Sequence, residues 1–373
     1  MSLMEKPNIY FDNAATTPPL NIRAQDGIIY NPSSPHKPGI AAERILYNAR
    51  KSLAGLFGIS HDIIFTSGGT EANNLALLGW VMANKRYDIT VYAPAWEHPS
   101  VTEPLRFIRD GGLAHTEEFS DLSDLPQMRG GSRCLVSLSH ISHETGDIND
   151  IVKVAKSLKA QQPDTIIHVD GVQGFCKERA DFRDIDMYSF SGHKCHGSLG
   201  VGGVVFFREI RLMPLMYGGG QERGLRPGTE NVPGIIQTVQ TAANLCENLD
   251  THHDHVSAIK ARIASLCEEL PDVYINSRTD TVSPYILNMS FTGIKGETLV
   301  HLLSEKGVHA SMGAACRSRK KATSLLELMG FAPKRAQSAV RFSFSHLNTL
   351  EEADIAREII INCVNQLRKV FGR

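Results

Sequence analysis

Between about residues 60 and 210, short apolar runs that favour β-strands alternate with amphipathic runs that favour helices. Several of the strand-like runs are apolar at consecutive positions, which indicates strands covered on both faces. This alternation predicts an α/β domain with helices on both sides of a sheet, and ligand sites in such sheets gather where the strands end. The predicted strands are Ile63–Ser67, Ile89–Pro94, Cys134–His140, Thr165–Asp170, Met187–Ser191 and Gly203–Phe207, and the helices are Glu71–Lys85 and Ile151–Gln161.

The C-terminal third of the chain has a different pattern. A long helical stretch from Val232 to Leu270 contains a polar break over 250–255, and we place a domain boundary near it. A chain of 373 residues is long enough for two domains. We predict a large α/β domain over 12–250 and a smaller α+β domain over 251–373 that includes residues 1–11. Its predicted elements are strands Val273–Asn276, Ile286–Phe291, Val308–Met312 and Ala339–Ser345, and helices Glu297–Lys306 and Leu350–Val370.

Composition excludes several classes of partner. Lys and Arg number 39 and Asp and Glu 40, so a net charge of −1 gives no reason to expect nucleic acid or an anionic membrane. No apolar run reaches the roughly 18 residues that a membrane helix needs, and the N-terminal residues do not resemble a secretion signal. The seven cysteines form no CxxC pair, which favours reduced thiols in a cytoplasmic protein. No metal site is expected.

Two loops after predicted strands could hold a phosphorylated cofactor. Lys194 follows the strand that ends at Ser191, and desolvation there would lower a lysine pKa and favour a Schiff base. In the run 66–71, Gly69 allows close approach of the backbone, and free N–H groups at the helix start attract an anion, with Thr70 as a further donor. Each motif alone also fits a structural turn.

Asp170 and His98 also follow predicted strands. An aspartate at this position could pair with a protonated pyridine nitrogen and keep the ring an electron sink, and Gln173 could hydrogen-bond a ring hydroxyl. His98 could stack on a flat ring and move protons. Taken alone, Asp170 is more simply a helix N-cap and His98 a structural histidine.

Two further candidates lie in the C-terminal region. Cys316 closes a run of small residues that would help a loop stay mobile, and the basic residues directly after it favour the thiolate. A buried packing role suits Cys316 less well than it suits Cys246, Cys267 or Cys363. Arg341 lies inside an apolar strand and needs an anionic partner, either a substrate carboxylate or a structural Asp or Glu.

The order and spacing of these motifs resemble one family. The runs are FDNAATTP, NPSSPHKPG, TSGGTEANNLA, EHPSV, HVDGVQG, SFSGHK, GGGQERGLRPGTENV, SMGAAC and VRFSF. They resemble the fold-type I, class-V aminotransferase-like enzymes that use pyridoxal 5'-phosphate (PLP), and among these the cysteine desulfurases, from about residue 9 to 360. The resemblance implies a PLP-dependent transferase fold of type I. Such a fold has a large domain with a mostly parallel, seven-stranded sheet covered by helices, and a smaller α+β domain carrying a nucleophile loop.

The resemblance also implies roles for the matching residues. Lys194 would bind PLP covalently, and Thr229 would reach the phosphate of the neighbouring subunit, which predicts a homodimer. Cys316 would attack the sulfur of L-cysteine, leaving a persulfide on the enzyme and L-alanine as product. The sulfur would then pass to an acceptor protein, for iron–sulfur clusters or tRNA thiolation. The implied catalytic residues are Lys194, Cys316 and His98; the cofactor-binding residues are Gly69, Thr70, His98, Asp170, Gln173, Ser191, His193, Lys194 and Thr229; and the substrate-binding residues are Asn13, His143 and Arg341.

The chain departs from the family pattern at three places. Ser142 and His143 stand where the family has two asparagines, the second of which helps to hold the substrate carboxylate. The stretch 18–31 is shorter than usual. The loop after Lys194 lacks the family's proline and second lysine, and Cys195 in this loop is expected to be a packing residue.

Two other functions stay open on the sequence. A selenocysteine lyase or a cysteine desulfhydrase that releases sulfide directly is favoured by the replacement at His143. A degenerate, non-catalytic scaffold for sulfur delivery is the alternative of another class. Intact Lys194, Asp170, His98 and Cys316 argue against the scaffold.

Overall fold

The computed structural model describes residues 6–20, 30–58, 62–120, 122–313 and 324–371. The chain forms two compact units, here called the larger unit (Pro18–His140 and Asn149–Asn248) and the smaller unit (Met1–Thr17, Ile141–Ile148 and Leu249–Arg373). Segments 12–17 and 141–148 thus belong to the smaller unit. Whether the predicted ranges 12–250 and 251–373 are domains that fold independently stays a prediction, because compactness alone does not test independent folding.

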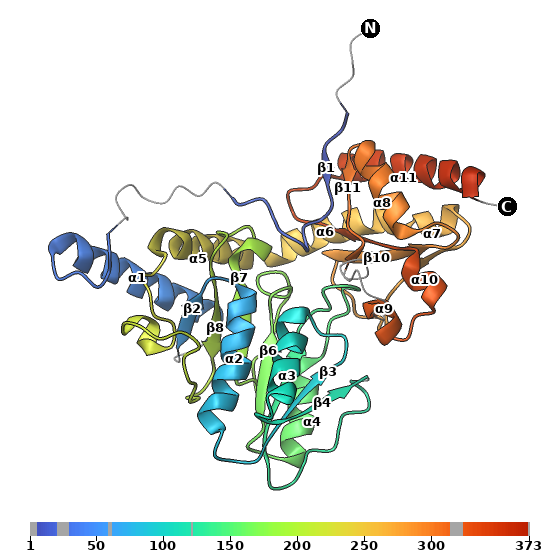
Figure 1. The fold of residues 1–373 in the computed structure, drawn as a ribbon. Helices are drawn as coiled ribbons and strands as arrows, with labels where there is room; N and C mark the ends of the chain where they lie inside the picture. The colour runs from blue at the N-terminus through green and yellow to red at the C-terminus, as the bar shows by residue number, and fades with distance from the viewer. Residues whose placement is uncertain (1–5, 21–29, 59–61, 121, 314–323, 372–373) are drawn as a thin grey trace. The chain divides into compact units, whose positions relative to one another are not determined.

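The larger unit is built on a seven-stranded sheet (Figure 1). Strand β8 is antiparallel to both of its neighbours, and every other neighbouring pair is parallel. The predicted α/β class with a mostly parallel sheet is therefore confirmed. In spatial order the strands are β2 (Ile63–Thr66), β8 (Gly202–Phe206), β7 (Met187–Ser191), β6 (Ile166–Asp170), β5 (Arg133–Ser139), β3 (Ile89–Pro94) and β4 (His115–Phe119).

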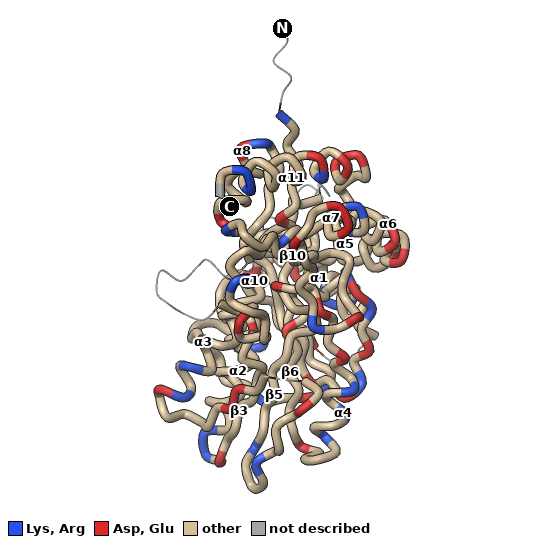
Figure 2. Tube along the Cα trace, turned by 90° about the vertical axis from the view of Figure 1, so that its right-hand side faces the viewer, with Lys and Arg blue, Asp and Glu red and all other residues tan. Residues whose placement is uncertain are grey.

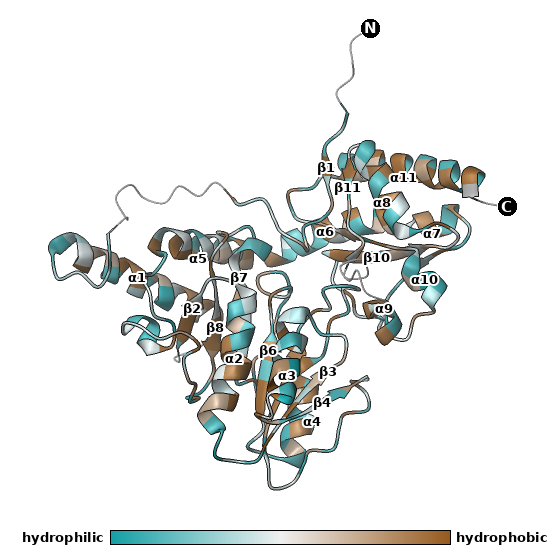
Figure 3. Cartoon of the chain, in the orientation of Figure 1, coloured by the Kyte–Doolittle hydropathy of each residue, from teal (hydrophilic) through white to brown (hydrophobic). Residues whose placement is uncertain are grey.

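Helices cover both faces of this sheet because successive strand residues point to opposite sides. Phe65 and Val136 pack with helices α1 (Lys37–Leu56), α4 (Ile151–Gln161) and α5 (Val232–Glu247). Their neighbours Ile64 and Leu135 pack with α2 (Gly69–Asn84) and α3 (Pro99–Asp110). Figure 3 shows the resulting hydrophobic colouring of strands such as β2. Burial on both faces explains the continuous apolar runs of the sequence.

The smaller unit has an α+β arrangement. Its three-stranded antiparallel sheet has the order β12 (Ala339–Ser343), β10 (Ile286–Phe291) and β9 (Val273–Ile275), and β1 (Ile9–Tyr10) pairs in parallel with β11 (Val308–His309). Val256, Leu299 and Ile360, from three different helices, share one apolar core with the strands. The helices are α6 (Leu249–Ala264), α7 (Leu266–Glu269), α8 (Gly296–Glu305), α9 (Leu325–Leu328), α10 (Pro333–Gln337) and α11 (Leu350–Phe371).

The predicted break in the long helical stretch is wrong in position. Helix α5 ends at Glu247, the capping residue Asn248 leaves helical geometry at φ −104° and ψ 17°, and α6 then runs through 250–255. The polar residues there occupy the helix surface, whereas Leu249 and Val256 are buried. A polar surface is compatible with a helix, so the polar run did not mark its end.

The described helices carry no sign of a membrane span, since none is long and apolar enough to cross a bilayer. Figure 2 shows basic and acidic residues interspersed along the chain. This mixture accords with the net charge of −1.

Candidate active site

Strand register brings the predicted residues of the larger unit to one edge of its sheet. Strand β6 ends at Asp170 and the neighbouring β7 ends at Ser191. Ser191 of β7 and Thr66 of β2 both pair with Gly202, the first residue of β8. The short 3₁₀-helix Gly192–Lys194, which carries the predicted Schiff-base lysine, follows β7 directly. The strand ends that precede the candidate motifs therefore meet, as expected for an open α/β sheet.

The glycine-rich turn before α2 packs against two of these strand ends. A Cβ atom added at Gly69 would lie 2.5 Å from Val172 Cγ2 and 3.5 Å from Ser191 Cβ. Only glycine allows this approach, which places the start of α2, with Thr70 exposed to solvent, next to the end of β7. The Ser191 hydroxyl oxygen is buried and has no hydrogen-bond partner. An unpaired buried hydroxyl is costly, so this atom is suited to a ligand oxygen.

Asp170 and His98 are linked by hydrogen bonds that the sequence did not reveal. Asp170 Oδ1 accepts the backbone N–H of Val172 at 3.0 Å, and Oδ2 accepts the side-chain amide of Asn73 at 2.7 Å. The same amide donates to Ser100 Oγ at 2.8 Å, and this hydroxyl lies 2.8 Å from His98 Nδ1. Asn73 and Ser100 therefore connect two predicted cofactor residues. The sequence offered one signal for this connection: the side-chain amide of Asn73, about one turn after the start of helix α2.

His98 has a defined ring orientation because it caps helix α3. Its Nδ1 accepts the backbone N–H of Ser100 at 3.1 Å, which satisfies one of the free N–H groups at the helix start. When Nδ1 accepts this bond, the neutral ring carries its proton on Nε2. Nε2 is then the atom that can exchange a proton with a ligand.

Glu97, the residue before His98, was not a sequence candidate. It is 3% exposed, and its Oε1 accepts the backbone N–H of Ser139 at 2.8 Å, whereas Oε2 is buried without a partner. Burial, together with the negative charge of Asp170, raises the pKa of Glu97 to about 8. The carboxyl group is therefore mostly protonated at neutral pH, beside an aspartate that holds two hydrogen bonds.

A cluster of basic groups surrounds the lysine loop. Burial, together with the positive charges of Lys194 and Lys177, lowers the pKa of His193 to about 4. The His193 ring is thus neutral at neutral pH. Lys177, which the sequence analysis missed, is 5% exposed and donates to the side-chain oxygen of Gln173 at 3.4 Å. Gln173 and Lys177 lie in the turn that follows Asp170, and the charge of Lys177 influences the pKa of His193 in the lysine loop.

The three predicted substrate-binding residues all lie in the smaller unit. Arg341 Nη1 donates to the backbone oxygen of His143 at 2.7 Å, and Nη2 lies 3.3 Å from Asp12 Oδ1. A structural acid therefore does accompany the arginine, but its buried Nε has no partner. Asn13 donates through Nδ2 to the backbone oxygen of Ser343 at 3.1 Å, while its buried Oδ1 has no partner. Arg341 and Asn13 thus each keep one atom for a ligand.

Two sequence candidates remain, Cys316 and Thr229. Cys316 is outside the described residues, and Thr229 is exposed on the loop before α5.

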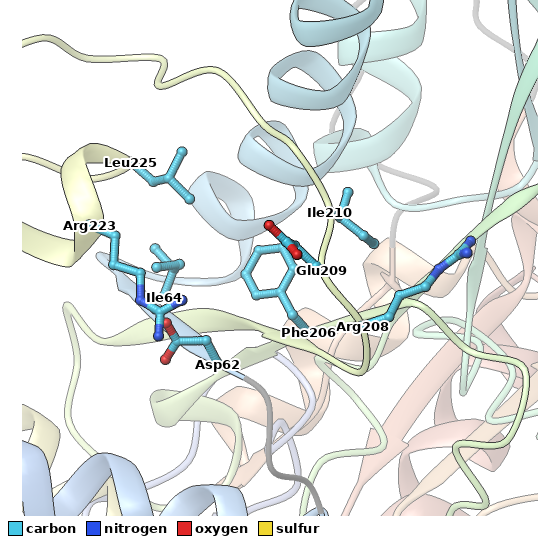
Figure 4. Close-up of a pocket in the computed structure, with 8 residues that line it drawn as sticks. All are labelled: Asp62, Ile64, Phe206, Arg208, Glu209, Ile210, Arg223 and Leu225. Carbon is cyan, nitrogen blue, oxygen red and sulfur yellow. The ribbon is translucent and has the colours of Figure 1, made fainter.

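A cavity of about 370 Å³ lies at the opposite edge of the sheet, where β2 begins and β8 ends (Figure 4). It is lined by Asp62, Ile64, Phe206, Arg208, Glu209, Ile210, Arg223 and Leu225, none of which is a candidate residue.

Comparison with known proteins identifies the family. The family model for class-V aminotransferases matches residues 9–355. The chain belongs to the class-V aminotransferase family. The chain is 37% identical to the NifS/IcsS protein homolog of Lactobacillus delbrueckii subsp. bulgaricus, over 93% of this chain and 94% of that protein. It is 33% identical to the cysteine desulfurase IscS of Buchnera aphidicola subsp. Schizaphis graminum, over 98% of this chain and 94% of that protein.

A solved structure of a NifS-like protein also matches this chain, with a TM-score of 0.89 and 30% identity over 96% of this chain and 100% of that one. The resemblance to the cysteine desulfurases is thus confirmed. Class-V aminotransferases and cysteine desulfurases are PLP-dependent. The sheet edge of this family member fits such a group, because the unpaired Ser191 hydroxyl and the glycine turn suit a phosphate and Asp170 suits a pyridine nitrogen.

Proposed function

We propose that this protein is a PLP-dependent cysteine desulfurase. It converts L-cysteine to L-alanine and keeps the sulfur as a persulfide on Cys316. The observation that carries the proposal is the meeting of Lys194, Asp170 and Ser191 at one edge of the sheet. The relatives named as cysteine desulfurases favour this substrate over the others that PLP enzymes use.

The larger unit provides the cofactor-binding residues of this proposal. Bound PLP supplies an electron sink for bonds at the substrate α- and β-carbons. Lys194 would hold the cofactor covalently, and Asp170, fixed by the amide of Asn73, would pair with the pyridine nitrogen. Ser191 and Thr70 would donate hydrogen bonds to the phosphate, together with the backbone at Gly69, the neutral ring of His193 and Thr229 of the neighbouring subunit. Gln173 would contact the ring hydroxyl.

His98 would stack on the ring and move protons. Its Nδ1 is held by the N–H of Ser100, so the exchanging atom is Nε2. A histidine is suited to this task because its pKa lies near neutral pH.

The smaller unit provides the residues that would bind the substrate. The Arg341 guanidinium has an unpaired buried Nε, which can bind a carboxylate. Asn13 would contact the substrate through Oδ1, its unpaired atom. His143 would add one hydrogen bond, and its backbone oxygen already orients Arg341.

Sulfur transfer would be carried out by the Cys316 thiolate. As this thiolate attacks the substrate sulfur, an S–S bond forms and the bond between sulfur and the β-carbon breaks. The electron pair of the broken bond stays on the carbon fragment, which takes up protons and leaves as alanine. Cysteine and one enzyme thiol thus become alanine and one persulfide, with no external oxidant or reductant. The basic residues after Cys316 support its thiolate form.

The same proposal includes the assembly and the fate of the sulfur. A homodimer would allow Thr229 to reach the phosphate of the neighbouring subunit, and the exposure of Thr229 supports this arrangement. The persulfide sulfur would pass to an acceptor protein in the cytoplasm.

The test combines a spectrum with product analysis. The absorbance of the purified protein is recorded before and after L-cysteine is added without reductant, and alanine, persulfide and free sulfide are measured. Wild type should shift its cofactor band and form alanine with an enzyme persulfide. Cys316→Ala should keep the cofactor band but lose the persulfide, and Cys267→Ala, which replaces a half-buried cysteine, should behave as wild type. Lys194→Ala should lose covalently bound cofactor.

Two results would contradict the proposal. If sulfur transfer in Cys316→Ala were unchanged, Cys316 would not be the nucleophile. Free sulfide without any persulfide would instead support a lyase or desulfhydrase.

A further inference from the structure

Three cysteines of the larger unit lie together although they are far apart in the sequence. The Sγ atoms of Cys176 and Cys246 are 3.5 Å apart, and Cys195 lies close enough to contribute to the raised pKa of Cys176. Cys176 lies in the turn after β6, Cys195 follows the 3₁₀-helix of Lys194, and Cys246 lies in the last turn of α5. The proposed desulfuration uses none of these thiols.

Cys176 and Cys246 differ in accessibility and acidity. Cys246 is half-buried, whereas Cys176 is 7% exposed. The hydrogen bond with Cys176 lowers the pKa of the Cys246 thiol, although burial opposes this effect. Burial, together with the neighbouring thiols, raises the pKa of Cys176. Since the thiolate is the nucleophile, Cys246 is the thiol that reacts first, and Cys176 lies behind it as a protonated thiol.

The backbone holds Cys176 in an unfavourable conformation that directs its thiol toward α5. Its φ is +58°, in the left-handed region that a glycine adopts at much lower cost. Its Sγ lies 3.8 Å from the backbone oxygen of Ala242, one helical turn before Cys246 on α5. The turn therefore presents the thiol to the helix face that carries Cys246.

A metal site does not explain this group of thiols. Within the described ranges, no set of three or more His, Cys, Asp or Glu side chains has an arrangement that could hold a metal ion. A disulfide needs a sulfur–sulfur distance of about 2.05 Å, so the two sulfur atoms must approach by roughly 1.5 Å. Side-chain rotation and a small shift of the turn can supply such a movement.

We propose that Cys246 and Cys176 form a dithiol site that hydroperoxides oxidise to a disulfide. The Cys246 thiolate attacks the peroxide, whose O–O bond breaks; one oxygen joins the sulfur as sulfenic acid, and the other leaves as an alcohol or water. Cys176 sulfur then attacks Cys246 sulfur, the S–S bond forms, and the first oxygen leaves as water with the thiol proton. The two thiols lose two electrons, and the hydroperoxide accepts them.

Peptide mapping tests the site in the PLP-loaded, full-length protein. Reductant is removed, hydrogen peroxide is added for a series of times, free thiols are alkylated in denaturant, and trypsin digestion follows. Cleavage after Lys177, Arg208 and Lys260 leaves the three cysteines in three different peptides. We expect a linked pair that contains Cys176 and Cys246, with a mass two hydrogen atoms below the sum of the separate peptides. Cys246 should be consumed at least roughly tenfold faster than the buried Cys134.

Variants separate the roles of the three thiols. Cys195→Ser should still form the linked pair, because Cys195 is 1% exposed and lies outside the reacting pair. In Cys176→Ser, the disulfide between positions 176 and 246 cannot form, so Cys246 should proceed to sulfinic acid. A link from Cys176 to Cys195, the absence of any link in wild type, or equal oxidation rates of Cys246 and Cys134 would each overturn the proposal. None of these outcomes depends on desulfurase activity, so they are independent of the proposed function.

Discussion

Replacing the buried carboxyl group of Glu97 by an amide should make the larger unit less sensitive to rising pH. The pKa of Glu97 is raised from 4.5 to about 8, mainly by burial and then by the charge of Asp170. Between these two values the folded protein binds a proton that the unfolded chain releases. By linkage, wild-type stability therefore falls as pH rises through this window, and the loss is complete only above the folded pKa.

The size of the effect follows from the two pKa values. Each pKa unit corresponds to about 1.4 kcal/mol, and the window from about pH 6 to about pH 8 lies mostly below the folded pKa. The free energy of unfolding of Glu97→Gln, relative to wild type, should therefore rise by roughly 2 kcal/mol over this window. The side-chain amide oxygen of the variant can still accept the N–H of Ser139, and groups that titrate alike in both proteins cancel in the difference.

Tryptophan fluorescence reports the unfolding of the larger unit, which contains Glu97. The chain has two tryptophans, Trp80 and Trp96, and both are buried in the larger unit. Urea unfolding of the PLP-free protein at the two pH values gives the difference between the variants. The exposed Glu117→Gln serves as control, and the difference between its free energy of unfolding and that of wild type should be the same at both pH values. A difference between Glu97→Gln and wild type that is the same at both pH values would refute the reasoning.

Two further substitutions test the packing around the site by urea unfolding. Gly171→Ala would place a Cβ 1.8 Å from the Tyr188 ring and should cost roughly 2–3 kcal/mol, whereas Gly130→Ala, with nothing within 4 Å, should change the free energy of unfolding by less than about 0.5 kcal/mol. Arg50→Ala should cost roughly 2–4 kcal/mol, because it leaves the buried carboxylate of Glu222 without its ion-pair partner. Adding Glu222→Gln to Arg50→Ala should recover part of this loss. A double variant that is as unstable as Arg50→Ala alone would contradict the explanation.

The parts of the fold that could be predicted from the sequence are those where burial controls the residue pattern. Strands β3 and β7 occupy the predicted ranges Ile89–Pro94 and Met187–Ser191, because both of their faces are covered. Strand β4, at the sheet edge, was missed since Phe119 is its one buried residue. The break placed over 250–255 failed for a related reason, as polarity reports exposure and not the end of a helix.

The candidate site also has residues that could be predicted from the sequence and residues that could not. Motifs that follow strands could be assigned from the sequence to one edge of the sheet, because the ends of parallel strands share an edge, and Asp170 and Lys194 follow the neighbouring strands β6 and β7. The residues that contact these candidates were missed. For example, the side-chain amide of Asn73 donates to Asp170, which lies 97 positions later in the sequence. Glu97 was passed over because a glutamate beside a histidine has no signature until its burial is known. Such contacts depend on how helices pack on the sheet, which local sequence does not encode.

The cysteines show why a count of residues is a weak guide to chemistry. Scattered thiols without a CxxC pair suggested isolated packing residues, and Cys195 is indeed buried. Yet the fold brings the Sγ atom of Cys176 within 3.5 Å of the Sγ atom of Cys246, which lies 70 positions later in the chain. The backbone of Cys176 has a positive φ, in the left-handed region. A left-handed conformation outside glycine has a cost that the surrounding structure must offset. The turn is held on one side by Asp170 and its neighbours and on the other by α5, so the same strand end that positions the cofactor candidates also positions the dithiol.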